Sequence, residues 1–204
     1  MGYGLVTTVG PALEPVTLAE AKKHLTVGHS DDDTLIGRFI CAAREQTETE
    51  TGRRWMPQTL TMSFGEFPRR SEEVAGVCVP VIRLPVDPVS AVNAVRYYDA
   101  AGVLQTLTAG THYLAWLAHS PPLVYPAPGQ VWPQTQLGRF GAVEVEFVAG
   151  YANANVVPSA AKVAMLLAVG LWYENRGDSE DPTELGLPPA ALRLLRSLST
   201  GHYS

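Results

Sequence analysis

The sequence is short of charged residues, and this shortage limits what the protein can bind. Asp, Glu, Lys and Arg make up 17% of the chain, and the net charge is −5 at pH 7. A protein that binds DNA without regard to its sequence needs a basic stripe that displaces counterions from the phosphates. The chain has only isolated pairs of arginines, Arg53–Arg54 and Arg69–Arg70, which we expect on solvated loops or at subunit contacts. A mildly acidic surface can still line a path for DNA, because repulsion keeps the duplex mobile.

Cysteines and long apolar runs are scarce as well. Cys41 falls on the apolar face of an expected helix and Cys78 in an apolar strand, so we predict two buried thiols in a reducing compartment. Without CxxC spacing they cannot form a structural zinc site by themselves. No segment reaches the run of about 18 apolar residues that spans a membrane, and no basic stretch followed by an apolar run opens the chain. We therefore expect a protein without a membrane partner that stays in the cytoplasm until it is assembled.

The motifs of common enzyme and nucleotide sites are missing too. The sequence contains neither a GxxxxGK[ST] nor a GxGxxG loop, and it has no GxSxG turn. None of the five histidines has a spacing typical of a zinc or catalytic site. These histidines are His24, His29, His112, His119 and His202. We expect no catalytic residue, no cofactor and no metal ion.

A few residues have a functional alternative to their structural role. Glu144 and Glu146 project from one strand face, and paired carboxylates serve glycoside hydrolysis, but alternate residues of an exposed strand are usually polar for solvation alone. The acidic run 31–33 suits the positive end of the helix that follows it and lacks the Gly and Glu of an EF-hand. Glu48 and Glu50 are predicted to be ordinary helix-surface residues. Four scattered tryptophans could stack on sugars or bases, but core or interface packing is the expected use of Trp55, Trp116, Trp132 and Trp172.

Two helices are predicted near the start of the chain, after an extended arm. Thr17 and Glu20 form a capping box for a helix over residues 18–25. The second helix follows the acidic run and ends at Thr51-Gly52, where glycine is a typical stop. Its apolar positions repeat with the period of one buried helix face. They are Leu35, Ile36, Phe39, Ile40 and Ala43.

Two more helices are predicted toward the other end. The third begins at Pro158, a favoured residue of the first helical turn, and runs to about Asn175. It is apolar on nearly every side, so it must be covered all round, and a neighbouring subunit is a natural cover. A polar loop over residues 178–187 precedes a last short helix that opens with Pro188-Pro189.

Between Trp55 and Tyr151 the pattern changes to the period of two that is typical of strands. Strands are expected, in chain order, over residues 59–64, 77–84, 89–98, 103–107, 112–117, 123–126 and 141–148. Pro80 predicts an edge or a bulge within the second of them. In the last one, Val143, Val145 and Phe147 are predicted to face inward, with Glu144 and Glu146 outward.

The expected fold class is α+β, with a helical bundle domain built from both chain ends and an inserted antiparallel β domain. The expected divisions are an N-terminal arm over 1–16, a helical domain over 17–54 and 155–200, a β domain over 55–151, and a C-terminal tail over 201–204.

Five segments, in order, resemble those of the head–tail connector (adaptor) family of tailed bacteriophages and gene transfer agents. The first is the EPVTLAEAKKHL opening at residues 14–25. The second combines DDDTLI at 31–36 with AARE at 42–45 and TGR at 51–53. The third is LPVDPV at 84–89, and the fourth is YPAPGQVWP at 125–133. The fifth is VEFVAGY at 145–151, followed by Val157-Pro158 and WYENR at 172–176.

The resemblance implies a structural, non-enzymatic protein of the virion or phage-like particle. It implies a homo-oligomeric ring of about a dozen copies beneath the portal protein, closed by a head-to-tail interface. Such a ring extends the DNA channel without sequence-specific binding and offers a platform to a stopper, a tail-completion protein or the tail.

In this family the helical domain builds the ring and the C-terminal segment usually grips the portal. The residues that we expect at the subunit interface are Leu35, Phe39, Val163, Leu167, Leu171 and Trp172. Those expected to bind the portal are Leu192, Arg193, Leu195, Arg196 and Leu198; the alternative is that this last helix folds back onto its own subunit.

Two other functions remain as alternatives. One is a tail-associated carbohydrate-binding or hydrolytic protein that uses Glu144, Glu146 and the tryptophans, and it needs a concave site with converging carboxylates. The other is a DNA-packaging factor, which needs a basic groove and a salt-dependent affinity.

Overall fold

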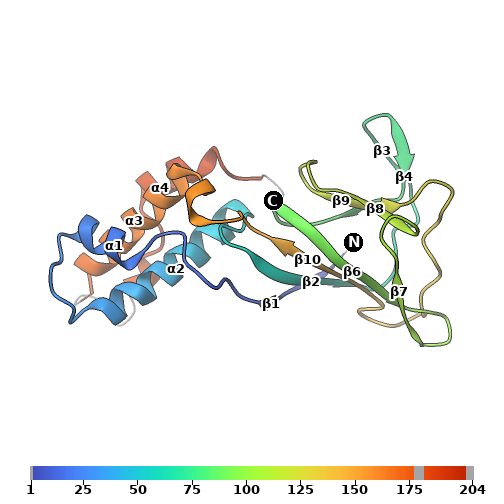
Figure 1. Cartoon of the computed structure of the whole chain (residues 1–204), viewed down its shortest axis with the longest axis horizontal. Coiled ribbons are helices and arrows are strands. Elements are labelled where there is room, and N and C mark those ends of the chain that lie inside the picture. The colour runs from blue at the N-terminus through green and yellow to red at the C-terminus, as the bar shows by residue number, and fades with distance from the viewer. Residues whose placement is uncertain (1, 177–181, 201–204) are drawn as a thin grey trace. The chain divides into compact units, whose positions relative to one another are not determined.

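The structure, a computed structural model, describes residues 2–176 and 182–200. The chain divides into two compact units, one of Met1–Gly10 and Gln58–Gly150 and the other of Pro11–Pro57 and Tyr151–Ser204. We call them the β unit and the helical unit (Figure 1). The mixed α+β fold class is confirmed. The predicted tail over 201–204 and part of the predicted loop over 178–187 lie outside the described residues.

The helical unit contains four helices and two short 3-10 turns among the described residues. They are α1 (Leu18–Leu25), α2 (Asp33–Thr51), η1 (Ala154–Val156), α3 (Ser159–Glu174), η2 (Pro182–Leu185) and α4 (Pro189–Arg196). The capping box of α1 is present, because the Thr17 hydroxyl accepts from the Glu20 N–H while the Glu20 carboxylate accepts from the Thr17 N–H. Gly52 ends α2 in the left-handed conformation, with φ of 68°.

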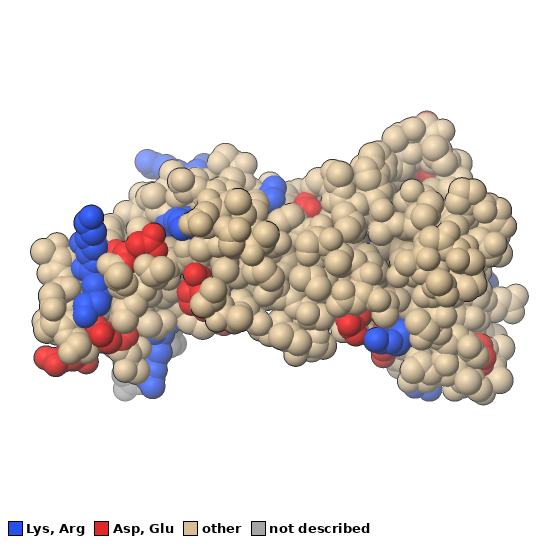
Figure 2. Space-filling view, in the orientation of Figure 1, with Lys and Arg blue, Asp and Glu red and all other residues tan. Residues whose placement is uncertain are grey.

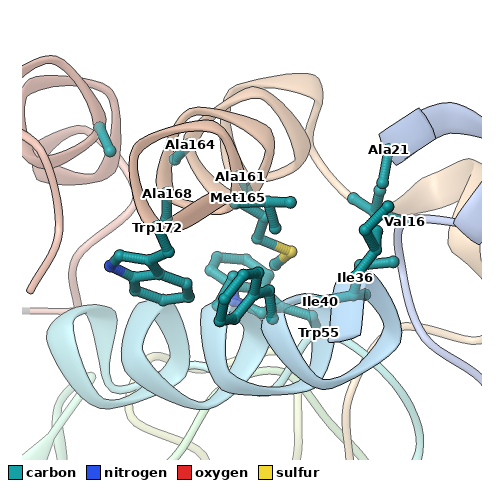
Figure 3. Packing of buried hydrophobic residues seen from close by; sticks show 14 of the residues in the cluster. Val16, Ala21, Ile36, Ile40, Trp55, Ala161, Ala164, Met165, Ala168 and Trp172 are labelled. Carbon is teal, nitrogen blue, oxygen red and sulfur yellow. The ribbon is translucent and has the colours of Figure 1, made fainter. Parts of the chain in front are cut away.

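The core of the helical unit lies between α2 and α3. Figure 3 shows Ile36 and Ile40 from the one helix facing Met165 and Trp172 from the other. Trp55, which follows α2, is fully buried in the same cluster, and its indole N–H donates to the Thr47 hydroxyl. Because the core residues of α2 lie on one face of the helix, the spacing of apolar residues in the sequence was enough to predict this buried face.

Helix α3 is covered largely within its own unit. It packs against α1, α2, η2 and α4, and seven of its residues are buried. The sequence had suggested a neighbouring subunit as the cover of this helix. The physical reason for the difference is that α4 and η2 fold back onto it, a packing that is not encoded in the period of α3 itself.

The β unit has ten strands among the described residues. They are β1 (Gly4–Val9), β2 (Gln58–Phe64), β3 (Glu72–Val74), β4 (Val77–Val79), β5 (Ile82–Arg83), β6 (Val89–Tyr98), β7 (Leu104–Leu107), β8 (Tyr113–Trp116), β9 (Leu123–Pro126) and β10 (Val143–Ala149). They form a five-stranded sheet in the order β1-β2-β10-β6-β7, a three-stranded sheet in the order β5-β9-β8, and the β3–β4 hairpin.

Every strand pair of the five-stranded sheet is antiparallel. Strand β10 at its centre alternates as predicted, with Val143, Val145 and Phe147 fully buried. These side chains belong to a cluster that also contains residues of the three-stranded sheet. The β unit therefore has a core of its own, built between two sheets.

Two features of the β unit differ from the expectations. Strand β1 lies within the segment expected to be an extended arm, and it pairs with β2. Cys78, predicted to be a buried thiol, is exposed, while Cys41 is half-buried. The run containing Cys78 breaks at Pro80, as predicted, and β4 therefore pairs only with β3, in a hairpin that leaves Cys78 at the surface.

Candidate assembly surfaces

A buried ion-pair network holds the start of the helical unit to α2. The Arg44 Nε atom lies 2.8 Å from Glu14 Oε2, and its Nη1 atom lies 3.2 Å from Glu48 Oε2. Glu48 also accepts the backbone N–H of Trp55 at 2.9 Å. Burial acts to lower the pKa of Arg44, but the carboxylates of Glu48 and Glu14 outweigh it and raise the pKa above its ordinary value. The network thus joins two of the segments that carried the family resemblance, at residues 14–25 and 42–45.

Glu48 was predicted on the helix surface, and that prediction is wrong, since the residue is 4% exposed. The physical reason is that Arg44, one turn earlier, shares its buried face and supplies the opposite charge. The sequence signal was the i, i+4 spacing of an Arg and a Glu on the apolar side of the helix.

The six residues expected at the subunit interface fall into three groups by burial. Phe39 and Trp172 are buried and meet edge to face, with ring centroids 6.1 Å apart. Val163 is 45% exposed. The remaining three are half-buried and pack against the same core; they are Leu35, Leu167 and Leu171. The accessible part of this group is therefore Val163 with the exposed portions of the three leucines, while Phe39 and Trp172 pack beneath it in the core.

The five residues expected to bind the portal divide in the same way. Leu195 is buried, and Leu198 packs against the core of the helical unit. Arg193 and Arg196 are exposed, and Leu192 is half-buried. The apolar stripe of α4 is thus directed mainly into its own unit, so the two arginines form the accessible part of this group.

Hydrogen bonds also hold the C-terminal segment to its own unit. The Trp172 indole N–H donates to the carbonyl of Gly186 at 3.1 Å, and the backbone N–H of Thr200 donates to the carbonyl of Thr51 at 3.0 Å. The Arg53 guanidinium donates to the carbonyl of Leu198. These contacts make α4 a structural part of the helical unit.

The loop after β9 is held in place by Trp132 and exposes the neighbouring Val131. The Trp132 ring stacks on Phe67 with centroids 4.7 Å apart, and its indole N–H donates to the carbonyl of Pro80 at 2.9 Å. Gly129 has φ of 77°, which favours glycine. Beside the anchored Trp132, Val131 is 83% exposed. The segment at residues 125–133, one of the five that carried the resemblance, therefore combines an anchor with an exposed apolar residue.

The surroundings of this loop are unusually poor in charge. From Ala100 to Gly138 the chain contains no Asp, Glu, Lys or Arg, and Figure 2 shows wide areas of the β unit without either charged colour. Exposed apolar side chains accompany this segment or follow it directly; they are Val103, Leu104, Trp116, Val131, Leu137 and Phe140. Exposed aromatic and apolar residues without charges are typical of the centre of a protein interface.

One of the two carboxylates predicted on the outer face of β10, that of Glu146, is held by other side chains of the sheet. Glu146 Oε2 lies 3.0 Å from Arg96 Nη1, and Asn93 donates to Oε1 at 3.2 Å. The hydrogen bonds from Arg96 and Asn93 hold the pKa of Glu146 below its ordinary value. A general acid for glycoside hydrolysis needs the opposite shift, so Glu146 is unsuited to that role.

Residues 2–176 and 182–200 contain neither a cluster of metal ligands nor a candidate membrane-spanning helix. Over these ranges, no three His, Cys, Asp or Glu side chains lie close enough together to hold a metal ion. Over the same ranges, no helix combines the length and the apolar character that crossing a membrane requires.

Comparison with known proteins agrees with the motifs. Residues 15–100 match the family described as Phage gp6-like head-tail connector protein. No curated protein matches the chain.

Solved structures share the fold along nearly the whole chain. A chain in the neck of an empty gene transfer agent particle, computed with C6 symmetry, has a TM-score of 0.72 and 23% identity, with 98% of this chain and 95% of that chain covered. A chain in the virion of a native gene transfer agent particle also has a TM-score of 0.72 and 23% identity, over 96% and 94%. For the neck of the native particle computed with C12 symmetry, the TM-score is 0.71 and the identity 23%, over 98% and 95%.

The resemblance indicated by the motifs is thereby confirmed: over residues 15–100 the chain matches the head–tail connector family, and over nearly its whole length it has the fold of a chain found in gene transfer agent necks.

Proposed function

We propose that the protein is a structural subunit of the head–tail connector in a phage or gene transfer agent particle. The observation that carries this proposal is the shared fold with neck chains over 98% of the sequence, together with the family match at residues 15–100. On this proposal the protein is a component of the virion. It forms a ring of about twelve copies beneath the portal, extends the DNA channel, and provides the attachment platform for the next connector or the tail.

The distribution of exposed apolar side chains supports a role in assembly. A subunit of a ring stacked between two partners covers much of its surface with protein. The charge-free segment 100–138 and the exposed Phe140 give the β unit such a surface, and Val163 gives one to the helical unit. The mildly acidic net charge suits a channel through which DNA slides without binding.

Mass measurement on the purified full chain, alone and mixed with its portal, tests the ring. We expect closed oligomers of about twelve copies, at least when the portal is present. A chain that stays monomeric with the portal at concentrations well above those of assembly would overturn the proposal.

Contact with the portal is assigned to Arg193, Arg196 and the accessible part of Leu192. Deleting α4 does not test this contact, because Leu195 is part of the core of the helical unit. The double variant Arg193→Glu/Arg196→Glu keeps the core, and we expect normal thermal unfolding with portal binding weakened at least tenfold. Arg69→Glu, a charge reversal at an exposed arginine of the β unit, is the matched control. Unchanged portal binding by the double variant would remove these arginines from the contact.

A further inference from the structure

The five-stranded sheet of the β unit ends in two strands that leave hydrogen-bonding groups open on their outer sides. Strand β1 forms one edge and β7 the other. Five of the six residues of β1 are exposed. Proteins usually protect such edges with lysines, prolines or covering segments. Neither β1 (GLVTTV) nor β7 (LQTL) contains a charged residue or a proline, and only the register shift between Thr7 and Val9 interrupts β1.

The two edges run in the same direction. The sheet has five strands and each neighbouring pair is antiparallel, so the first and the fifth strands are parallel to each other. A second copy placed beside the first in the same orientation would set its β1 next to β7 as a parallel pair. In a head-to-tail ring, one surface of each subunit contacts a different surface of the next, and the same rotation relates every neighbouring pair. Two different sheet edges meet this requirement.

The outward groups of β7 can be assigned from the hairpin. The Asp99 N–H donates to the carbonyl of Val103 at 3.0 Å. Because antiparallel strands alternate between bonded and non-bonded residues, Gln105 and Leu107 bond toward β6. The backbone N–H and C=O groups of Leu104 and Thr106 therefore point away from the sheet and are available to another strand.

Side chains on one face of the two edges also suit each other. On the face opposite the core, Val6 of β1 lies next to Thr61 of β2, which in turn lies next to Glu146 of β10. Leu104 and Thr106 lie on that same outer face, because Val95 and Leu107, which are paired with each other, lie on the core face. Val6 is 61% exposed and Leu104 is 48% exposed. Apolar and β-branched neighbours on adjacent strands stabilise a sheet.

We infer that β1 of one copy pairs in parallel with β7 of the next, so that the five-stranded sheet continues from subunit to subunit around the ring. This inference rests on the proposed ring. It assigns the β unit a part in closing the ring, in addition to the helical surface around Val163. The charge-free segment that begins just before β7 then lies beside the junction between copies.

Disulfide cross-linking tests the pairing. In a Cys78→Ser background, Val6→Cys is combined with Leu104→Cys or with Thr106→Cys, and the oligomer is oxidised and run on a non-reducing gel. Within one copy these positions are separated by four strand spacings, about 19 Å, which a disulfide cannot bridge. Any bond between them therefore joins two copies, and we expect a ladder that reaches the size of the ring.

Matched variants control for chance contacts. Val6→Cys combined with Gln105→Cys places the second thiol on the core face, and we expect at least fivefold less linkage. Mixing the two single variants should give dimers and nothing larger. Each single variant alone should give no product, which also controls for Cys41. Dimers from Val6→Cys alone would show that β1 pairs with β1, and this would overturn the inference.

The remaining outcomes separate the two proposals. A ring that forms with the portal but yields no Val6-dependent ladder would overturn the sheet junction and leave the proposed function standing. If no ring forms in the presence of the portal, both the proposed function and the junction are wrong.

Discussion

The helical unit and the β unit use their polar and apolar residues in opposite ways. The helical unit contains a buried ion-pair network around Arg44 and a capping box at Thr17, and few large apolar side chains among its described residues are exposed. Among its described residues, the β unit has its ion pairs near the surface, as with Arg96 and Glu146, and it exposes Val131, Leu137 and Phe140. The difference indicates that buried charges help to stabilise the helical unit, whereas the β unit leaves apolar side chains exposed.

The largest expected effect compares two tryptophans. Trp172 is fully buried in the helical unit, whereas Trp116 in the β unit is 40% exposed. We expect Trp172→Ala to lower the free energy of unfolding by about 3–5 kcal/mol, and Trp116→Ala to lower it by less than about 1 kcal/mol. Chemical denaturation of both variants measures the difference. Equal losses would contradict the contrast between the units.

The second comparison concerns two arginines. Arg44→Ala leaves the buried carboxylate of Glu48 without this cation, and we expect a loss of about 3 kcal/mol in the free energy of unfolding. Arg96→Ala removes a partly exposed pair with Glu146, for which we expect less than about 1 kcal/mol. The two variants are compared by denaturant titration at neutral pH. A loss for Arg96→Ala as large as that for Arg44→Ala would show that the β unit also depends on its charges.

A smaller effect is expected at the start of α1. Thr17→Ala removes the cap and should cost about 1 kcal/mol. The Thr17 backbone N–H and hydroxyl hold the pKa of Glu20 below its ordinary value, so the contribution of this carboxylate is present above its unfolded-state pKa and is lost as the pH falls through its folded-state pKa. The destabilisation by Thr17→Ala should therefore be larger at pH 7 than in acid. Thermal unfolding at several pH values measures it, and a cost that grows in acid would be inconsistent with the capping box.

The smallest effect on stability is expected at Phe140. The side chain is 99% exposed, so Phe140→Ser should change the free energy of unfolding by no more than about 0.5 kcal/mol. If the β unit exposes apolar residues for partners, the same variant should weaken assembly with the next protein of the particle. Thermal unfolding tests the expected stability, and a binding measurement on the assembled ring tests the expected loss of assembly. A variant that is destabilised but assembles normally would reverse the interpretation of this surface.

Local patterns account for what the sequence predicted well. The capping box at Thr17, the stop at Gly52 and the alternation of β10 each depend on residues within a few positions of one another, and the structure has all three. The predicted order of helices and strands follows from such signals. Strand β1 was missed because its flanking glycines and prolines suggested an arm, although Val6 to Val9 are all β-branched residues typical of strands.

Features that depend on distant parts of the chain were harder to predict. Glu48 is buried beside Arg44, and Arg44 is also paired with Glu14, which lies 30 residues before it in the sequence. The cover of α3 by α4 follows a loop whose path carries no periodic signal. For the assembly surfaces, apolar periodicity located α3 and α4 but could not say which side of each faces its own unit, and therefore Trp172 and Leu195 were assigned to contacts with partners.

The insertion of the β unit between the two halves of the helical core has a consequence for synthesis on the ribosome. Helix α2 ends at Thr51 and its main packing partner, α3, begins at Ser159, about a hundred residues later, which translation takes roughly 5 to 20 seconds to add. During that interval the apolar face of α2 has no partner from α3, whereas the strands from β2 to β10 precede α3 in the chain and leave the ribosome before it does. The β unit can therefore be complete while the nascent helical unit still exposes Ile36 and Ile40, and this is the stage at which the chain is most prone to aggregate or to bind a chaperone.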